Sequence, residues 1–172
     1  MAQLKIVRPH EQFIESYLSF ISEMRVLGEK IWDSHVPREG ETATRFVNRL
    51  LRADTSPEPG LVEETSYWAI SNEAVVGRIA LRHTLNKNLE EFGGHIGYEV
   101  RPSARRKGVA TEMLRLILKT PKAAEIGRIL LTCAPDNLAS NRTIQKNGGT
   151  LAKTTFVDRI QRQTNYYWID LK

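Results

Sequence analysis

Residues 94–118 read GHIGYEVRPSARRKGVATEMLRLIL, and the interpretation of the whole chain starts from this stretch. Residues 95–100 are rich in β-branched and aromatic side chains, which predicts a short strand. From Gly108 onward, apolar residues recur at i, i+3 and i+4 spacing, which predicts an amphipathic helix. A basic, proline-containing turn over residues 101–107 joins the two elements.

A strand that enters a helix through a basic, glycine-containing turn is suited to binding phosphate. The first amides of a helix lack partners within the helix, and the helix dipole places partial positive charge there. Gly108 allows the backbone to come close to a ligand, and Arg105, Arg106 and Lys107 add positive charge. The stretch therefore predicts an anion-binding site; the alternative is an ordinary exposed turn whose charges are solvated.

Two motifs carry a family resemblance. Val100-x-Pro102-x-x-Arg105-x-x-Gly108-x-Ala110 resembles the acetyl-CoA signature of the GNAT superfamily of N-acetyltransferases, Arg/Gln-x-x-Gly-x-Gly/Ala, and it stands between a predicted strand and a predicted helix. Residues 136–149, DNLASNRTIQKNGG, are similar to a second family segment, Asn-x-x-Ser…Glu-Lys-x-Gly-Phe. Two separate motifs in the family's order make the resemblance more specific than either motif alone.

The order of the predicted elements also resembles the GNAT fold over essentially the whole chain. We expect strands at 4–7, 66–71, 74–83, 95–100, 128–134, 150–157 and 165–171, and helices at 10–27, 42–53, 108–118 and 138–147. The resemblance implies an α/β (α+β) fold: a mixed, mostly antiparallel central sheet flanked by helices. It also implies that acetyl-CoA binds where the two central parallel strands, 95–100 and 128–134, splay apart. We expect residues 1–172 to form a single domain.

The resemblance further implies which residues bind acetyl-CoA, as a co-substrate. They are Tyr98, Val100, Arg105, Arg106, Lys107, Gly108, Val109, Ala110, Thr111, Asn137 and Ser140. Asn137 is equally compatible with a helix N-cap. We expect no metal, since the single cysteine, Cys133, leaves no cysteine-based metal cluster.

Transfer in this family would be direct, with the amine attacking the thioester, so a base that removes a proton from the amine would help. Glu99 is our first candidate for that base, although it could equally be paired with an arginine or face solvent. His83 and His95 are second choices, since a lone histidine is more often structural. The general acid is unassigned: the usual tyrosine position is Ile144. Tyr98, Tyr166, Tyr167 or Ser140 could replace it, or the thiolate could leave without help.

The acceptor is left open by the sequence. Small amines, amino acids, antibiotics, protein N-termini and lysine side chains are all compatible with the resemblance, as is a homodimer. His83, His95 and Trp32 are our candidates for substrate-binding residues.

Composition restricts the remaining classes of function. The chain has 172 residues, 41% hydrophobic and 26% charged, and it shows no membrane-span-like run and no apolar signal region, so we expect a soluble, cytoplasmic protein. A pI near 9.5 raises the alternative of nucleic-acid binding, but the positive charge is concentrated in one turn without interleaved aromatic residues, which argues against it. A catalytically silent acetyl-CoA sensor is the second alternative.

Overall fold

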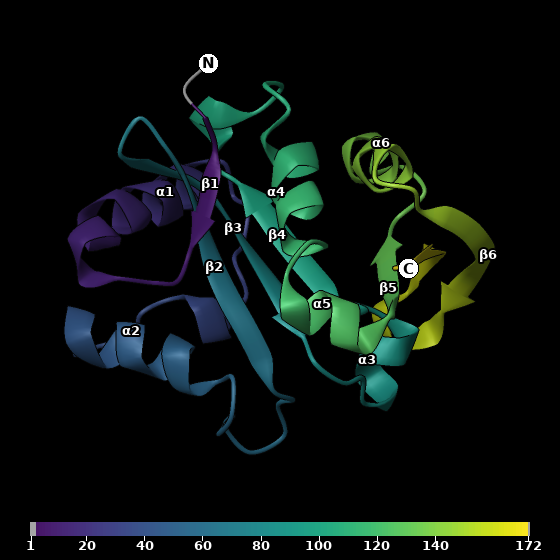
Figure 1. Cartoon of the computed structure of the whole chain (residues 1–172), viewed down its shortest axis with the longest axis horizontal. Helices are drawn as coiled ribbons and strands as arrows, with labels where there is room; N and C mark the ends of the chain where they lie inside the picture. Colours follow the sequence, from purple (N-terminus) through teal and green to yellow (C-terminus); the bar gives the residue numbers. More distant parts are fainter. Residues whose placement is uncertain (1–2, 172) are drawn as a thin grey trace.

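The computed structural model describes residues 3–171, and their strands form two sheets (Figure 1). The first sheet has the order β1-β2-β3-β4 and the second the order β5-β7-β6, and all neighbouring strands are antiparallel. Their bounds are β1 (Lys5–Val7), β2 (Glu64–Ser71), β3 (Ala74–Arg82), β4 (Ile96–Val100), β5 (Arg128–Cys133), β6 (Thr150–Val157) and β7 (Arg162–Asp170). The predicted α+β fold with mostly antiparallel strands is confirmed.

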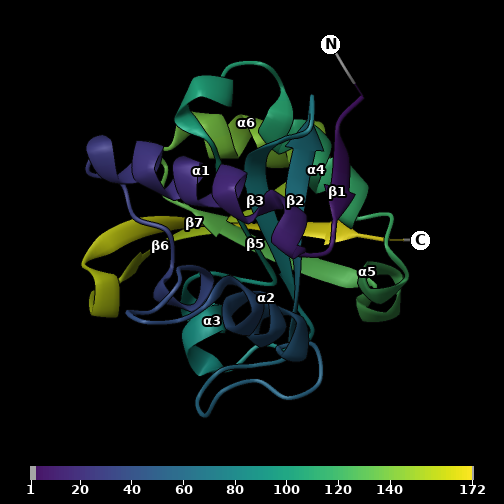
Figure 2. The ribbon, with the colours of Figure 1, turned by 90° about the vertical axis from the view of Figure 1, so that its left-hand side faces the viewer.

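Helices cover both faces of the first sheet. One face packs against α1 (Ile14–Val26) and α2 (Ala43–Arg52), which lie in front of β2 and β3 in Figure 2. On this face, the rings of Tyr17 and Trp68 stack with centroids 4.3 Å apart. The remaining helices are α3 (Lys87–Glu91), α4 (Val109–Ile117), α5 (Pro121–Ile126) and α6 (Leu138–Lys146). The core around α4 joins the opposite face of the first sheet to the second sheet.

The helix α3 was not among the elements expected from the sequence. Asn86 caps this helix, its side chain accepting a hydrogen bond of 3.0 Å from the amide of Leu89. A helix of five residues is too short to show an apolar period, which explains the omission. The strands expected at 66–71 and 74–83 are confirmed and pair as a hairpin; its turn residues, Asn72 and Glu73, both have positive φ, as tight hairpin turns require.

The two sheets meet at the start of β4. The amide of His95 donates to the carbonyl of Leu130 over 2.8 Å, and the amide of Leu130 donates to Nδ1 of His95 over 2.9 Å. In the described chain, β4 ends the first sheet and β5 begins the second, with α4 and α5 between them in sequence. The strands of the second sheet run across those of the first in Figure 2. Within residues 3–171, no helix is both long and apolar enough to cross a bilayer.

Candidate active site

A cleft of about 950 Å³ lies between β4 and β5, and we call it the interstrand cleft. Its walls come from β4, the end of β5, the first turn of α4, one side of α6, the loop after α1 and the start of β7. The fold thus brings together almost all the predicted cofactor residues, namely Tyr98, Val100, Arg105, Arg106, Gly108, Val109, Ala110, Thr111, Asn137 and Ser140. Lys107 does not line the cleft; its ammonium group donates to the carbonyl of Ser103 over 3.1 Å.

Two ion pairs hold the basic turn against the end of α1. The guanidinium of Arg105 contacts both carboxylate oxygens of Glu29, at 2.7 and 2.6 Å, and Arg101 pairs with Glu23 at 2.6 Å. These hydrogen bonds hold the pKa of Glu29 and that of Glu23 below their usual values. The carboxylate of Glu29 therefore largely neutralises the charge of Arg105. The Arg105 side chain holds the turn in place rather than presenting a free cation to the cleft.

The start of α4 is open to the cleft. Gly108 is the N-cap residue, with φ of +77°, and no side chain of the described residues caps the helix there. A Cβ added at Gly108 would meet no described atom within 4 Å, so the first amides of α4 can be approached from the cleft. Free amides at a helix N-terminus attract anions. The start of α4 thus has the open backbone that the predicted anion-binding site requires, and the binding of an anion there stays a prediction.

Of the cations in the cleft that were not predicted, two lie on α6. Arg142 and Lys146 of α6 both line the interstrand cleft and are exposed, and their i, i+4 spacing places them on one side of the helix. Within residues 3–171, neither forms an ion pair. The i, i+4 spacing could have indicated from the sequence that Arg142 and Lys146 share one side of a helix. Only the packing of α6 beside α4 shows that these two side chains line the same cleft as Arg106.

Among the hydroxyl groups considered for the general acid, two meet in the cleft. The hydroxyl groups of Tyr98 and Ser140 lie 2.7 Å apart, and burial raises the pKa of Tyr98 to about 12. In contrast, Tyr166 donates to the carbonyl of Glu91 and Tyr167 donates to Asn141, and both lie outside the cleft. Tyr98 is therefore a protonated hydrogen-bond donor at neutral pH.

Asn137 also has a defined structural role. Its side-chain oxygen accepts a hydrogen bond of 3.1 Å from the amide of Ser140, which caps α6. Asn137 lines the cleft as well, so the N-cap interpretation holds while the predicted contact with the cofactor remains a prediction.

Glu99 projects from the opposite face of β4 to Tyr98, as strand alternation requires. It pairs with Arg78, directly across on β3: Nη2 of Arg78 donates to Oε1 of Glu99 over 3.1 Å, and Nε lies 2.5 Å from Oε2. Arg78 is only 2% exposed, whereas Glu99 is half-buried and lines the interstrand cleft. The ion pair with an arginine, one of the two alternatives left open for Glu99, is present, and it coexists with access to the cleft.

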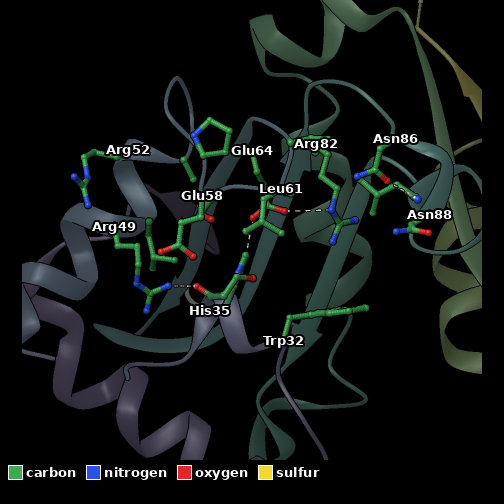
Figure 3. A pocket seen from close by; sticks show the side chains of 18 of the residues that line it. Trp32, His35, Arg49, Arg52, Glu58, Leu61, Glu64, Arg82, Asn86 and Asn88 are labelled. Atoms are coloured by element: carbon green, nitrogen blue, oxygen red, sulfur yellow. Dashed lines mark hydrogen bonds and ion pairs between the residues drawn. The ribbon is translucent and has the colours of Figure 1, made fainter. Parts of the chain in front are cut away.

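A second cavity, of about 290 Å³, adjoins the interstrand cleft; we call it the side cavity (Figure 3). It lies among α2, the loop at 53–62, the adjoining ends of β2 and β3, and α3. Trp32, Arg82 and Phe92 line both cavities, so the two spaces meet at these residues. The predicted substrate-binding residue Trp32 is thus placed at the junction.

The structure does not bring the other two substrate-binding candidates to either cavity. His83 lies with Nε2 2.8 Å from the hydroxyl of Thr65, and His95 joins the two sheets through Leu130. Both histidines have local structural partners, which is the alternative considered for lone histidines. Among the described residues, no group of three or more His, Cys, Asp or Glu side chains is arranged to hold a metal ion.

We expect the stability of the protein to depend on pH through the titration of His95. Burial and the nearby charge of Arg82 lower the pKa of His95 from 6.5 to about 4 in the folded protein. The unfolded chain binds a proton at His95 more readily than the folded chain does. The contribution of neutral His95 to the unfolding free energy is therefore complete above pH 6.5 and is lost as the pH falls through 4. We expect the unfolding free energy to fall by about 2–3 kcal/mol from this residue between pH 7 and 4.

Chemical denaturation at several pH values measures this dependence. Asparagine at position 95 can still accept from the amide of Leu130 but does not titrate, so the variant His95→Asn should show a flatter profile over this window. An equally steep profile in the variant would assign the pH dependence to other groups.

Known proteins resemble this chain in sequence. A family model described as "Acetyltransferase (GNAT) domain" matches residues 3–150. An uncharacterized N-acetyltransferase of Bacillus subtilis (strain 168), YnaD, is 24% identical over 161 residues, covering 91% of this chain and 82% of that protein.

Solved structures share the fold over nearly the full chain. The microcin C7 self-immunity acetyltransferase MccE, in complex with acetyl-CoA and AMP, superposes with a TM-score of 0.70 at 14% identity, covering 98% of this chain and 93% of its own. An acetyl transferase of Salmonella typhimurium that modifies the N-terminal serine of ribosomal protein L7/L12 gives 0.69 at 15% identity, with 100% and 97% coverage.

Proposed function

The chain belongs to the GNAT acetyltransferase family and is an N-acetyltransferase, and from this premise we propose that it transfers the acetyl group of acetyl-CoA directly onto a primary amine. The observation that carries the proposal is the interstrand cleft, in which the open N-terminus of α4 faces the gap between β4 and β5. Acetyl-CoA would supply an acetyl group activated as a thioester.

The cleft fits the phosphate end of such a molecule. The first amides of α4, approachable because Gly108 has no side chain, would bind the pyrophosphate. Arg106, Arg142 and Lys146 would add positive charge around it. MccE, which shares the fold, was solved with acetyl-CoA bound, which supports this use of the cleft.

The proposed base and the proposed hydrogen-bond donor to the leaving group lie on opposite faces of β4. Glu99 lies on the face that carries α1 and α2 and would accept a proton from the amine, directly or through one water molecule. Tyr98 lies on the opposite face and would donate a hydrogen bond to the leaving sulfur. With a pKa of about 12, Tyr98 is a weaker acid than a thiol, whose pKa is usually near 8.5, so it would stabilise the thiolate without fully protonating it.

The side cavity would hold the rest of the acceptor, because it meets the cleft at Trp32, Arg82 and Phe92. We retain the expectations of a cytoplasmic protein with a small-molecule or peptide amine as acceptor and without a nucleic-acid partner; a homodimer stays compatible with the sequence.

Calorimetric titration with acetyl-CoA tests the cleft. We expect micromolar binding by the wild type and a loss of about 100-fold or more in a variant with Gly108→Val and Ala110→Leu, because the new side chains would occupy the approach to the α4 amides. Gly40 also has a positive φ (+70°) and open space around a Cβ, so Gly40→Val is a matched control that should bind normally. Absence of binding by the wild type would contradict the proposal, and binding without amine-dependent thiol release would favour a sensor.

A further inference from the structure

The floor of the side cavity is a polar patch on the face of the first sheet that carries α1 and α2. Glu64 and Ser66 are two residues apart on β2 and so share this face, and Arg82 on β3 stands directly opposite Glu64. His35, in the loop between α1 and α2, lies with Nε2 2.7 Å from Oε1 of Glu64, and Nε of Arg82 lies 3.3 Å from Oε2. Figure 3 shows His35, Glu64 and Arg82 linked in this order at the cavity.

The loop that carries His35 is firmly held. Tyr17 donates to the carbonyl of His35 over 2.9 Å, and Arg49 donates to the carbonyls of Ser34 and Val36 over 2.6 and 3.0 Å. His35 is 4% exposed, so its position is set by the protein rather than by solvent. The imidazole is therefore a preorganised part of the cavity.

The charges around the floor are matched within the protein. Glu64 contacts His35 and Arg82, and Arg49 pairs with Glu41 at 2.8 Å. Burial, followed by the positive charges of Arg78, Arg82 and Arg49, holds the pKa of His35 well below 6.5, so that the imidazole is neutral at pH 7. An additional buried charge placed on this floor would find no free counter-ion there.

Three buried polar atoms of the floor have no hydrogen-bond partner among residues 3–171: both ring nitrogens of His35 and the hydroxyl of Ser66. Of these three, Nε2 of His35 has an ion-pair contact, at 2.7 Å from Oε1 of Glu64. Because Nε2 of His35 faces a carboxylate, the neutral ring carries its proton on Nε2 and leaves Nδ1 as an acceptor. Leaving such groups unsatisfied costs stability, so they point to a ligand group that supplies both a donor and an acceptor.

The surface of the side cavity is mostly apolar, and Arg52, Glu58, Asn86, Asn88 and Arg159 add polar groups to its walls. The large apolar side chains also belong to the walls above the floor. They include Trp32, Leu50, Leu61, Val62, Leu89 and Phe92. A cavity of about 290 Å³ lies at the lower end of the usual range for small-molecule sites, about 300–1,000 Å³, which suits a group of the size of one aromatic ring.

We infer that, within the N-acetyltransferase function proposed above, the side cavity selects a primary amine whose uncharged apolar or aromatic body ends in a hydroxyl group. The hydroxyl donates to Nδ1 of His35 and accepts from Ser66. A carboxylate has no hydrogen for Nδ1, and an ammonium would be buried beside three arginines.

The reacting amine of such a molecule would lie toward Glu99. Across the same face of the sheet, Ala80 on β3 pairs with Gly97 on β4, which gives a floor of small residues between the Glu64–Arg82 pair and the Arg78–Glu99 pair. Gly97 and Glu99 both line the interstrand cleft, so an acceptor seated in the side cavity would extend over Gly97 to the thioester.

Tyramine and phenethylamine are matched probes, since they differ only in the terminal hydroxyl. Their binding is measured calorimetrically with coenzyme A present, which reports on the cavity without turnover. We expect tyramine to bind about 10- to 100-fold more tightly than phenethylamine in the wild type. In Ser66→Ala this ratio should fall several-fold, and in His35→Gln it should fall as well, while Ser71→Ala, at the far end of β2, should keep the wild-type ratio.

Equal affinity for the two probes in the wild type would overturn the inference, and so would a ratio that survives in both cavity variants. Tighter binding of the polyamine spermidine than of tyramine would also overturn it. Thiol release from acetyl-CoA separates this inference from the proposed function. If tyramine binds preferentially but releases no thiol, the cavity assignment stands and the proposed transfer to the amine fails.

Discussion

Replacement of Glu99 by glutamine is expected to lower kcat/KM for the amine by about 10²–10⁴-fold, the usual contribution of a general base. Glutamine keeps the size of the side chain and an oxygen that can accept from Arg78, but it cannot take a proton from the amine. Thiol release from acetyl-CoA measures the rate, and titration with acetyl-CoA should give an unchanged affinity, because the cofactor contacts lie on other residues. An unchanged kcat/KM would exclude Glu99 as the base.

The partner of Glu99 complicates a simple reading of that variant. Arg78 is buried, and removing the charge opposite a buried arginine destabilises proteins by about 3–5 kcal/mol. The double variant Arg78→Met, Glu99→Leu removes both charges, so its stability should return to near that of the wild type. Activity should stay low in this double variant. Recovery of activity together with stability would mean that Glu99 acts only through the fold.

Gly94→Ala is expected to lower the unfolding free energy by about 4 kcal/mol or more, among the largest effects of single substitutions. A Cβ at position 94 would lie 2.4 Å from the carbonyl oxygen of Leu130, and this oxygen belongs to the backbone of β5 and accepts the amide of His95. The clash can be relieved only by separating the two sheets at their junction. Chemical denaturation gives the free energy directly.

Gly28 provides a matched control for the backbone conformation. Its φ is +68°, close to the +63° of Gly94, but a Cβ there would meet no described atom within 4 Å. Gly28→Ala should therefore cost only about 1–2 kcal/mol, the price of a left-handed conformation. A similar cost at both positions would show that the β4–β5 junction tolerates expansion.

Several features of the protein were predictable from short stretches of sequence. The strand, turn and helix of residues 94–118 appear as expected, and so do the strands expected at 66–71 and 74–83. The reason is that hydrophobic periodicity, glycine positions and turn-forming residues act over a few neighbouring residues. The structure that they produce can therefore be predicted from a short stretch of sequence. The open N-terminus of α4 belongs to the same group, because it depends on the backbone that follows Gly108.

Side-chain charge could not be assigned in this way. Arg105 and Lys107 look like phosphate ligands in the sequence. In the structure, however, Arg105 pairs with Glu29, and Lys107 donates to the carbonyl of Ser103. Arg142 and Lys146 bring charge to the cleft from another part of the chain.

The two pairings that matter most for the proposed chemistry are also long-range. The Glu99–Arg78 pair depends on the register between β3 and β4, and the His35–Glu64 contact depends on how the loop after α1 packs over β2. Register and packing are set by the burial of whole sheet faces and helices, not by neighbouring residues. For this reason the sequence predicted the family and most of the residues that meet in the interstrand cleft, whereas the partner of the proposed base and the side cavity emerged only from the folded chain.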